Sequence, residues 1–145
     1  MDTNKDTIRL LRECQAGVRM GIDSFDDIIG KVESKELKEI LRHSRERHCQ
    51  IGDEIGDLLE DCHDEGKQPP LMEEMMARLK AGFNMMGDEP DRQAARFITD
   101  GCHMGVKSIC EYFNKYPAAD VHVKRLVDKI VREEEGLMKS MRKFV

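Results

Sequence analysis

The hydrophobic positions of this chain recur at alternating steps of four and three, and the most regular pattern lies between Glu33 and His63. Its members, with the two polar residues that fall on the same line, are Leu37, Leu41, Ser44, His48, Ile51, Ile55, Leu58 and Cys62. This spacing is typical of a bundle helix that buries one face. We therefore expect a helix from an N-cap at Ser34 to about His63, with the His48 imidazole halfway along its buried side.

Three more stretches show the same spacing, from about Asn4 to Gly30, Pro90 to Lys115 and Ala118 to Phe144. Each contains one polar or cysteine position in the middle of its expected buried line. The predicted lines are Ile8, Leu11, Gln15, Val18, Ile22, Phe25 and Ile29; Ala95, Ile98, Cys102, Gly105, Ile109, Tyr112 and Tyr116; and Val123, Val127, Ile130, Glu134, Leu137, Met141 and Phe144. Nowhere do β-branched and polar residues alternate, so no strand is expected.

The lengths and connections of these helices predict a four-helix bundle. Each would span roughly 40 Å, and short links near Val32 and Pro117 predict two antiparallel hairpins. The long segment between them, Asp64 to Glu89, begins with a Gly- and Pro-rich breaker and includes a short helical pattern of its own. It can carry the chain back along the bundle. We therefore expect an all-α, ferritin-like four-helix bundle, formed as a single domain over residues 1–145 with a short extra helix in the crossover; a plain up-down bundle is the alternative.

Folding each hairpin about its turn predicts a polar layer at mid-height. Gln15 would lie near His48, and Cys102 near Glu134. Buried imidazole and carboxylate groups are costly unless they pair or bind something. Two interpretations follow: a self-satisfied polar layer that fixes the helix register, or a site for Fe, Zn or Mn.

The helix lengths, the long crossover and the central polar layer resemble the ferritin-like superfamily. More narrowly, the chain is similar to an uncharacterised bacterial family of small four-helix proteins, a domain-of-unknown-function group. The best local match is Cys102-x-x-Gly105, followed by Tyr112-Phe113 and Pro117. The resemblance implies a Glu after this Gly, and here the position is Val106.

The di-iron members of the superfamily use one Glu from each of two helices and a Glu-x-x-His from each of the other two. In this chain the corresponding positions read Arg45-x-x-His48 and Glu134-x-x-Leu137. Most of the implied ligands are therefore absent. We expect no ferroxidase or oxygenase chemistry and no resident cofactor, with a single Fe, Zn or Mn ion at His48, Glu134, Cys102 and Gln15 as the alternative.

Composition and charge narrow the possible partners. The net charge of −5 argues against nucleic acid, and no hydrophobic run approaches the ~20 residues that would span a bilayer. The charged start, Met1 to Leu10, has no signal-peptide core. Together with five cysteines, an odd number, this predicts a cytoplasmic protein with reduced thiols.

The segment from Leu71 to Met86 predicts self-association. Its hydrophobic face contains Met72, Met75, Met76, Leu79, Phe83 and Met86. A four-helix core is complete without it, so we expect this face to form a homodimer contact.

The sequence is compatible with three functions. The first is a non-enzymatic binding or assembly protein, since no enzyme signature appears. The second is a metal-binding or redox protein with a degenerate central site. The third is a thiol-based sensor using Cys14 and Cys49, which flank the first hairpin at similar predicted height.

Overall fold

The computed structural model describes residues 5–62 and 88–145, which form four long α-helices with no strand among them. The helices are α1 (Lys5–Ile28), α2 (Lys35–Asp61), α4 (Pro90–Lys115) and α5 (Val121–Met141), and a short 3-10 turn, η1 (Ile29–Lys31), follows α1. The predicted all-α bundle is confirmed. The Met-rich segment 71–86 and the expected dimer contact lie outside the described residues.

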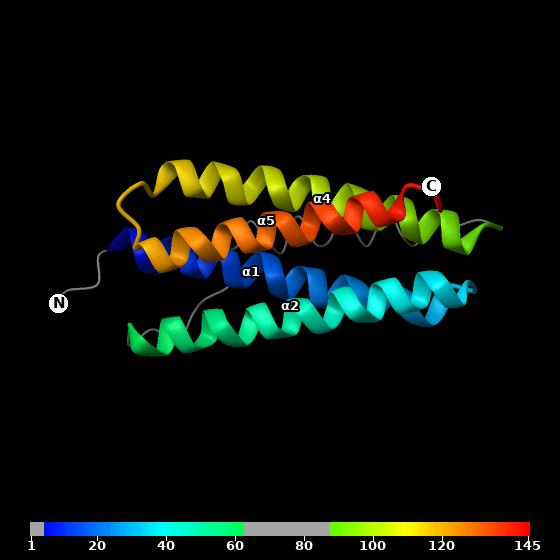
Figure 1. Cartoon of the computed structure of the whole chain (residues 1–145), viewed down its shortest axis with the longest axis horizontal. Coiled ribbons are helices and arrows are strands. Elements are labelled where there is room, and N and C mark those ends of the chain that lie inside the picture. The colour runs from blue at the N-terminus through cyan, green and yellow to red at the C-terminus, as the bar shows by residue number, and fades with distance from the viewer. Residues whose placement is uncertain (1–4, 63–87) are drawn as a thin grey trace.

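The helices pack as two hairpins, α1 with α2 and α4 with α5 (Figure 1). Across the hairpins α1 lies against α4, and α2 lies against α5. In Figure 1 the end of α2 and the start of α4 lie at opposite ends of the bundle, so these two helices run in the same direction.

Side-chain caps define where the helices begin. Ser34 Oγ accepts a hydrogen bond from the Leu37 amide at 3.2 Å, as expected for the N-cap of α2. Asp120 caps α5 in the same manner, accepting from the His122 amide at 2.8 Å. The last helix therefore starts at Val121, three residues later than the sequence pattern suggested.

Each hairpin loop is held by the first turn of a helix from the other hairpin. The Asp91 carboxylate of α4 accepts hydrogen bonds from the amides of Glu33 (2.7 Å) and Ser34 (3.1 Å). At the opposite end, Asp6 and Thr7 of α1 accept from the amides of Ala118 and Asp120. These contacts fix the two hairpins relative to each other along the bundle axis.

The middle of each predicted hydrophobic line is buried in the core, and the observed burial differs from the prediction in α2, in α1 and at the end of α4, where Tyr112 and Tyr116 are only partly buried. Leu59 is buried at 2% exposure where Leu58 was expected, and Leu58 is only partly buried. An α-helix has 3.6 residues per turn, so a strict seven-residue repeat drifts around its surface and the buried position moves by one residue.

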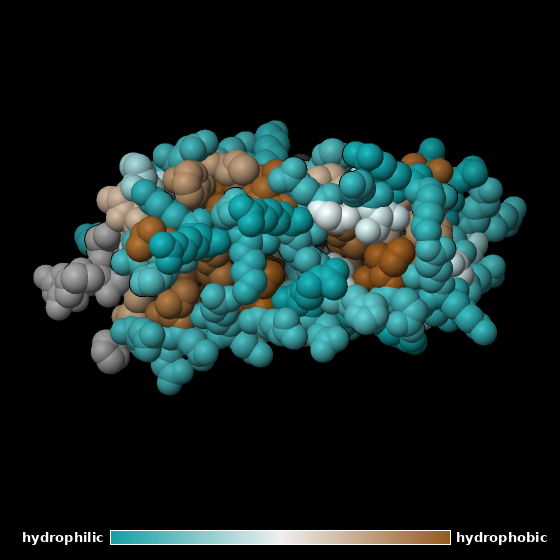
Figure 2. Space-filling model, viewed as in Figure 1, coloured by the Kyte–Doolittle hydropathy of each residue, from teal (hydrophilic) through white to brown (hydrophobic). Residues whose placement is uncertain are grey.

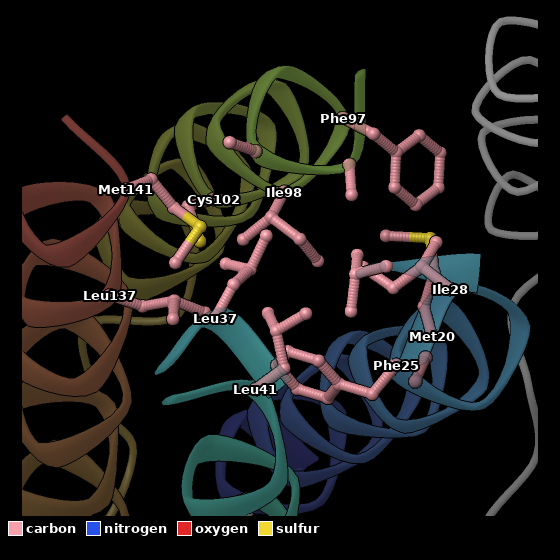
Figure 3. Close-up of a cluster of buried hydrophobic side chains, with 14 residues drawn as sticks. Met20, Phe25, Ile28, Leu37, Leu41, Phe97, Ile98, Cys102, Leu137 and Met141 are labelled. Atoms are coloured by element: carbon pink, nitrogen blue, oxygen red, sulfur yellow. The ribbon is translucent and has the colours of Figure 1, made fainter. Parts of the chain in front are cut away.

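Helix α1 has a broader buried face than predicted, and it packs most extensively against α2 and α4. Its buried residues include Leu10, Cys14, Ala16, Met20 and Ile28, whereas the predicted positions Ile8, Ile22 and Ile29 are only partly buried. Figure 3 shows one half of the core, where Leu37 and Leu41 of α2 and Ile98 of α4 point into the space between the helices. The outer surface is mainly hydrophilic on the face in Figure 2, with hydrophobic residues visible between the helices.

Candidate functional site

The centre of the bundle contains a buried ion pair between α2 and α5. His48 Nε2 lies 2.6 Å from Glu134 Oε1, and the two side chains are 3% and 14% exposed. The Phe25 ring packs against the imidazole in a T-shaped arrangement, with ring centroids 5.0 Å apart at an interplanar angle of 77°. His48 and Glu134, each of which interrupts the hydrophobic face of its own helix, are therefore in direct contact.

Both ring nitrogens of His48 face oxygen atoms. Nδ1 lies 2.7 Å from the backbone carbonyl of Ser44, which can only accept a hydrogen bond, so Nδ1 must carry a proton. A second proton must lie between Nε2 and Glu134 Oε1, because neither bare atom could donate. Burial by itself lowers the pKa of His48, but the hydrogen bond and charge of Glu134 outweigh it and raise the pKa above its ordinary value.

Cys102 of α4 adds a third member to this group. Its thiol is buried at 3% exposure and hydrogen-bonds to the Glu134 carboxylate. Burial raises the pKa of Cys102, and the nearby negative charge of Glu134 raises it further. The thiol is therefore protonated at neutral pH and acts as a donor.

The network continues from Ser44 to the surface. Ser44 Oγ donates to Glu133 Oε1 at 3.0 Å, and Arg47 Nε lies 2.8 Å from both oxygens of that carboxylate. Ser44 Oγ is 3.5 Å from His48 Nδ1, and its proton is directed to Glu133. Although serine, histidine and glutamate occur together, this serine is therefore not activated as a nucleophile.

Helix α1 contributes a glycine to this layer in place of the expected Gln15. A Cβ added to Gly21 would lie 2.9 Å from Cδ2 of the His48 ring, so only glycine allows the imidazole its present position. Gln15 is buried but is not among the residues lining the central cavity. The difference lies in the hairpin register, which is the axial alignment of α1 with α2. Val18 lies opposite Gly52, and Asp26 forms a salt bridge with Arg45, so the facing residues of the hairpin are centred near residue 35. The predicted register was centred on Val32.

The same register separates the two cysteines of the thiol-sensor hypothesis. With the facing residues centred near residue 35, Cys49 lies level with about residue 21, roughly 10 Å along the axis from Cys14. A disulfide requires Cα atoms within about 7 Å. All five cysteines are free thiols, and the register disfavours a Cys14–Cys49 bond.

A cavity of about 60 Å³ lies beside the His48–Glu134 pair. Its lining is mostly hydrophobic and comes from all four long helices. The polar residues of the lining are Ser24, His48, Glu134, Cys102 and Cys14. Four glycines also line it, Gly17 and Gly21 on α1 and Gly101 and Gly105 on α4. A Cβ at Gly17 or Gly101 would meet nothing within 4 Å.

The residues present do not fit a di-iron centre. Arg45, in the position of an expected Glu, forms a salt bridge with Asp26 at 2.6 Å, and Leu137, in the position of an expected His, is buried in the hydrophobic core. In the two described segments, no three or more His, Cys, Asp or Glu side chains are placed to hold a metal ion. None of the helices there is long and hydrophobic enough to cross a membrane.

Comparisons with known proteins inform the fold alone. No family model and no curated protein matches the chain. Among solved structures, the crystal structure of a DUF305 fragment from Deinococcus radiodurans is similar, with a TM-score of 0.78 and 15% sequence identity over 99% of this chain and 97% of that one. The fold is therefore one that a protein of the DUF305 group also adopts, which is consistent with the resemblance to a domain-of-unknown-function family.

Proposed function

We propose that this chain is a non-enzymatic binding protein whose central cavity receives a small molecule. The observation that carries the proposal is the cavity itself, which lies beside a buried ion pair and is bordered by helix glycines. A mostly hydrophobic hollow with a few convergent polar groups is the usual form of a ligand site.

The glycines support this proposal because they weaken the helices that contain them. A glycine inside a helix costs about 1 kcal/mol relative to alanine. Close packing accounts for Gly21, which touches His48, but Gly17 and Gly101 have empty space where a side chain would be. Because both residues line the cavity, their missing side chains leave room there for a ligand.

The state of His48 supports a binding role over a catalytic one. Both ring nitrogens already have oxygen partners, at 2.7 Å and 2.6 Å. A general base needs a free nitrogen lone pair directed at its substrate. In this arrangement the imidazole positions the Glu134 carboxylate and has no lone pair left to offer.

We further propose that the chain is related to the ferritin-like superfamily. The support is its connectivity: two antiparallel hairpins whose second and third long helices, α2 and α4, run in the same direction (Figure 1). A di-iron bundle with this connectivity that has lost most of its ligands would keep a cavity where the metals had been. The expected cytoplasmic location and the homodimer through residues 71–86 remain predictions.

The test is a ligand screen by ¹H–¹⁵N NMR, using small uncharged molecules and three proteins. Wild type should show shifts at the amides lining the cavity. Gly101→Leu fills the cavity and should lose these shifts, while Gly136→Leu, a matched change at an exposed position of α5 with open space around it, should keep them. Shifts that persist equally in Gly101→Leu would refute binding in the cavity.

A degenerate metal site is the alternative, because His48, Glu134 and Cys102 bring nitrogen, oxygen and sulfur together. A metal ion would have to separate His48 from Glu134, whose 2.6 Å bond uses the same lone pairs. We therefore expect protein purified without an affinity tag to contain iron, zinc or manganese at far below one ion per chain. Elemental analysis showing one bound ion per chain, lost in His48→Ala, would replace the ligand proposal with the metal site.

A further inference from the structure

We infer that the ligand of the central cavity is a small uncharged molecule with one hydrogen-bond donor on a compact hydrophobic body, and that it enters between α1 and α4. This inference rests on the proposed binding function and specifies its ligand class. Three properties of the cavity carry it: the free acceptor, the charge balance and the volume.

The acceptor is the second carboxylate oxygen of Glu134. Oε1 is occupied by His48 Nε2, whereas Oε2 lies 3.9 Å from the place where a Cβ on Gly105 would be. The missing side chain at Gly105 leaves this oxygen facing the cavity. A carboxylate oxygen can accept two hydrogen bonds, so Oε2 has capacity for a ligand donor in addition to the Cys102 thiol.

The charges around the cavity are already balanced, which argues against a charged ligand. The negative charge of Glu134 is already matched by the proton shared with His48, and both cysteine thiols of the lining are neutral. Burial raises the pKa of Cys14 to about 12, and it raises the pKa of Cys102 as well. An ammonium or carboxylate entering this space would lose its hydration without meeting an unmatched opposite charge.

The volume limits the ligand to a few atoms. At about 60 Å³ the cavity is less than half the roughly 150 Å³ of an engineered hydrophobic cavity that binds benzene. An alcohol of about three carbons is therefore a suitable probe.

The path by which a ligand would enter the cavity follows from the lining residues that are partly exposed. They are Gly17, Gly21, Ser24, Gly101, Gly105 and Glu134, and all but Glu134 belong to α1 or α4. The remaining lining residues are buried. Because α1 and α4 are neighbours, we place the entry route at the seam between their glycines, where most of the partly exposed lining residues of the described segments lie.

The experiment compares 1-propanol with methoxyethane, an isomer that has the same atoms but no O–H donor. Each is titrated into ¹⁵N-labelled wild type, Gly101→Leu and Gly136→Leu, with ethylammonium chloride as the charged probe. We expect 1-propanol to shift the amides of Gly17, Gly21, Gly101 and Gly105 in wild type and in Gly136→Leu. Methoxyethane should bind about tenfold more weakly, the difference of one net hydrogen bond, and ethylammonium should leave these amides unchanged.

Each other outcome has a defined meaning. If the two isomers bind equally and both are lost in Gly101→Leu, the donor inference is overturned while the cavity remains a binding site. If ethylammonium binds best, the charge argument is overturned. If none of the probes shifts the lining amides, both the ligand class and the binding function are overturned.

Discussion

At the scale of single residues, both ring nitrogens of His48 are hydrogen-bonded, so the free energy of unfolding depends on whether this ring is protonated. The raised pKa of His48 means that folding favours the protonated ring. The contribution is therefore complete below the unfolded pKa of about 6.5 and is lost as the pH rises through the folded value.

A comparison of wild type with His48→Gln measures this term. Removing one partner of a buried pair costs about 3 kcal/mol, so the variant should be less stable by that order at pH 6. The difference should shrink as the pH is raised above the folded pKa of His48. Urea denaturation between pH 5 and 9 gives the profile, and a difference that stays constant over this range would contradict the assignment.

The close contact at Gly21 gives a second residue-scale prediction. Gly21→Ala should destabilise the protein by about 1–3 kcal/mol, because the new Cβ would collide with an imidazole that is fixed by two hydrogen bonds. Gly17→Ala, one turn earlier on the same helix, should instead stabilise by about 0.5–1 kcal/mol, since its Cβ meets open space. Thermal unfolding of the two variants checks the sign, and equal stabilisation by both would show that the ring moves freely.

The sequence predicted the polar half of this site but not the glycine half. His48 and Glu134 were visible because each interrupts a hydrophobic line of regular spacing. The cavity was not visible because it arises where side chains are missing on two helices that face each other, α1 and α4. A possible signal was the matched Gly-x-x-x-Gly spacing of Gly17 with Gly21 and of Gly101 with Gly105.

At the scale of helices and loops, the axial register of α1 against α2 does not follow from the hydrophobic spacing. Spacing predicted which face of each helix is buried, but the height of one helix against another depends on the path of the loop. Here the 3-10 turn Ile29–Lys31 and the extended residue Val32 carry the chain onward before Ser34 starts α2. Gly21, not Gln15, therefore lies opposite His48.

The Asp91 contact that holds this loop can be tested. Asp91→Ala should destabilise by about 1 kcal/mol, because two backbone amides, at Glu33 and Ser34, lose a charged acceptor. Asp100→Ala, which removes an exposed acid from the middle of the same helix, is the control and should change stability by less than about 0.5 kcal/mol. Equal effects in urea denaturation would mean that the loop does not depend on Asp91.

At the scale of the whole molecule, the four long helices of the described residues and their two antiparallel hairpins followed from helix lengths and loop lengths, while the relative direction of α2 and α4 was left open between two alternatives. Short links force antiparallel hairpins, and a long link permits a parallel return along the bundle. The sequence did not predict which helix of one hairpin would lie against which helix of the other. All four long helices have hydrophobic faces with the same spacing, so none of these pairings was favoured. The contact of α1 with α4, which forms the open side of the cavity, was therefore found only in the structure.

A binding role requires that the cavity is an open space, and xenon tests this most directly. Xenon enters hydrophobic cavities without needing polar contacts. A crystal of the protein pressurised with xenon should show one bound atom among Gly17, Gly101 and Glu134, and a crystal of Gly101→Leu should show none. Absence of xenon from the wild-type cavity, with Met20 or Phe97 filling the space, would contradict the account.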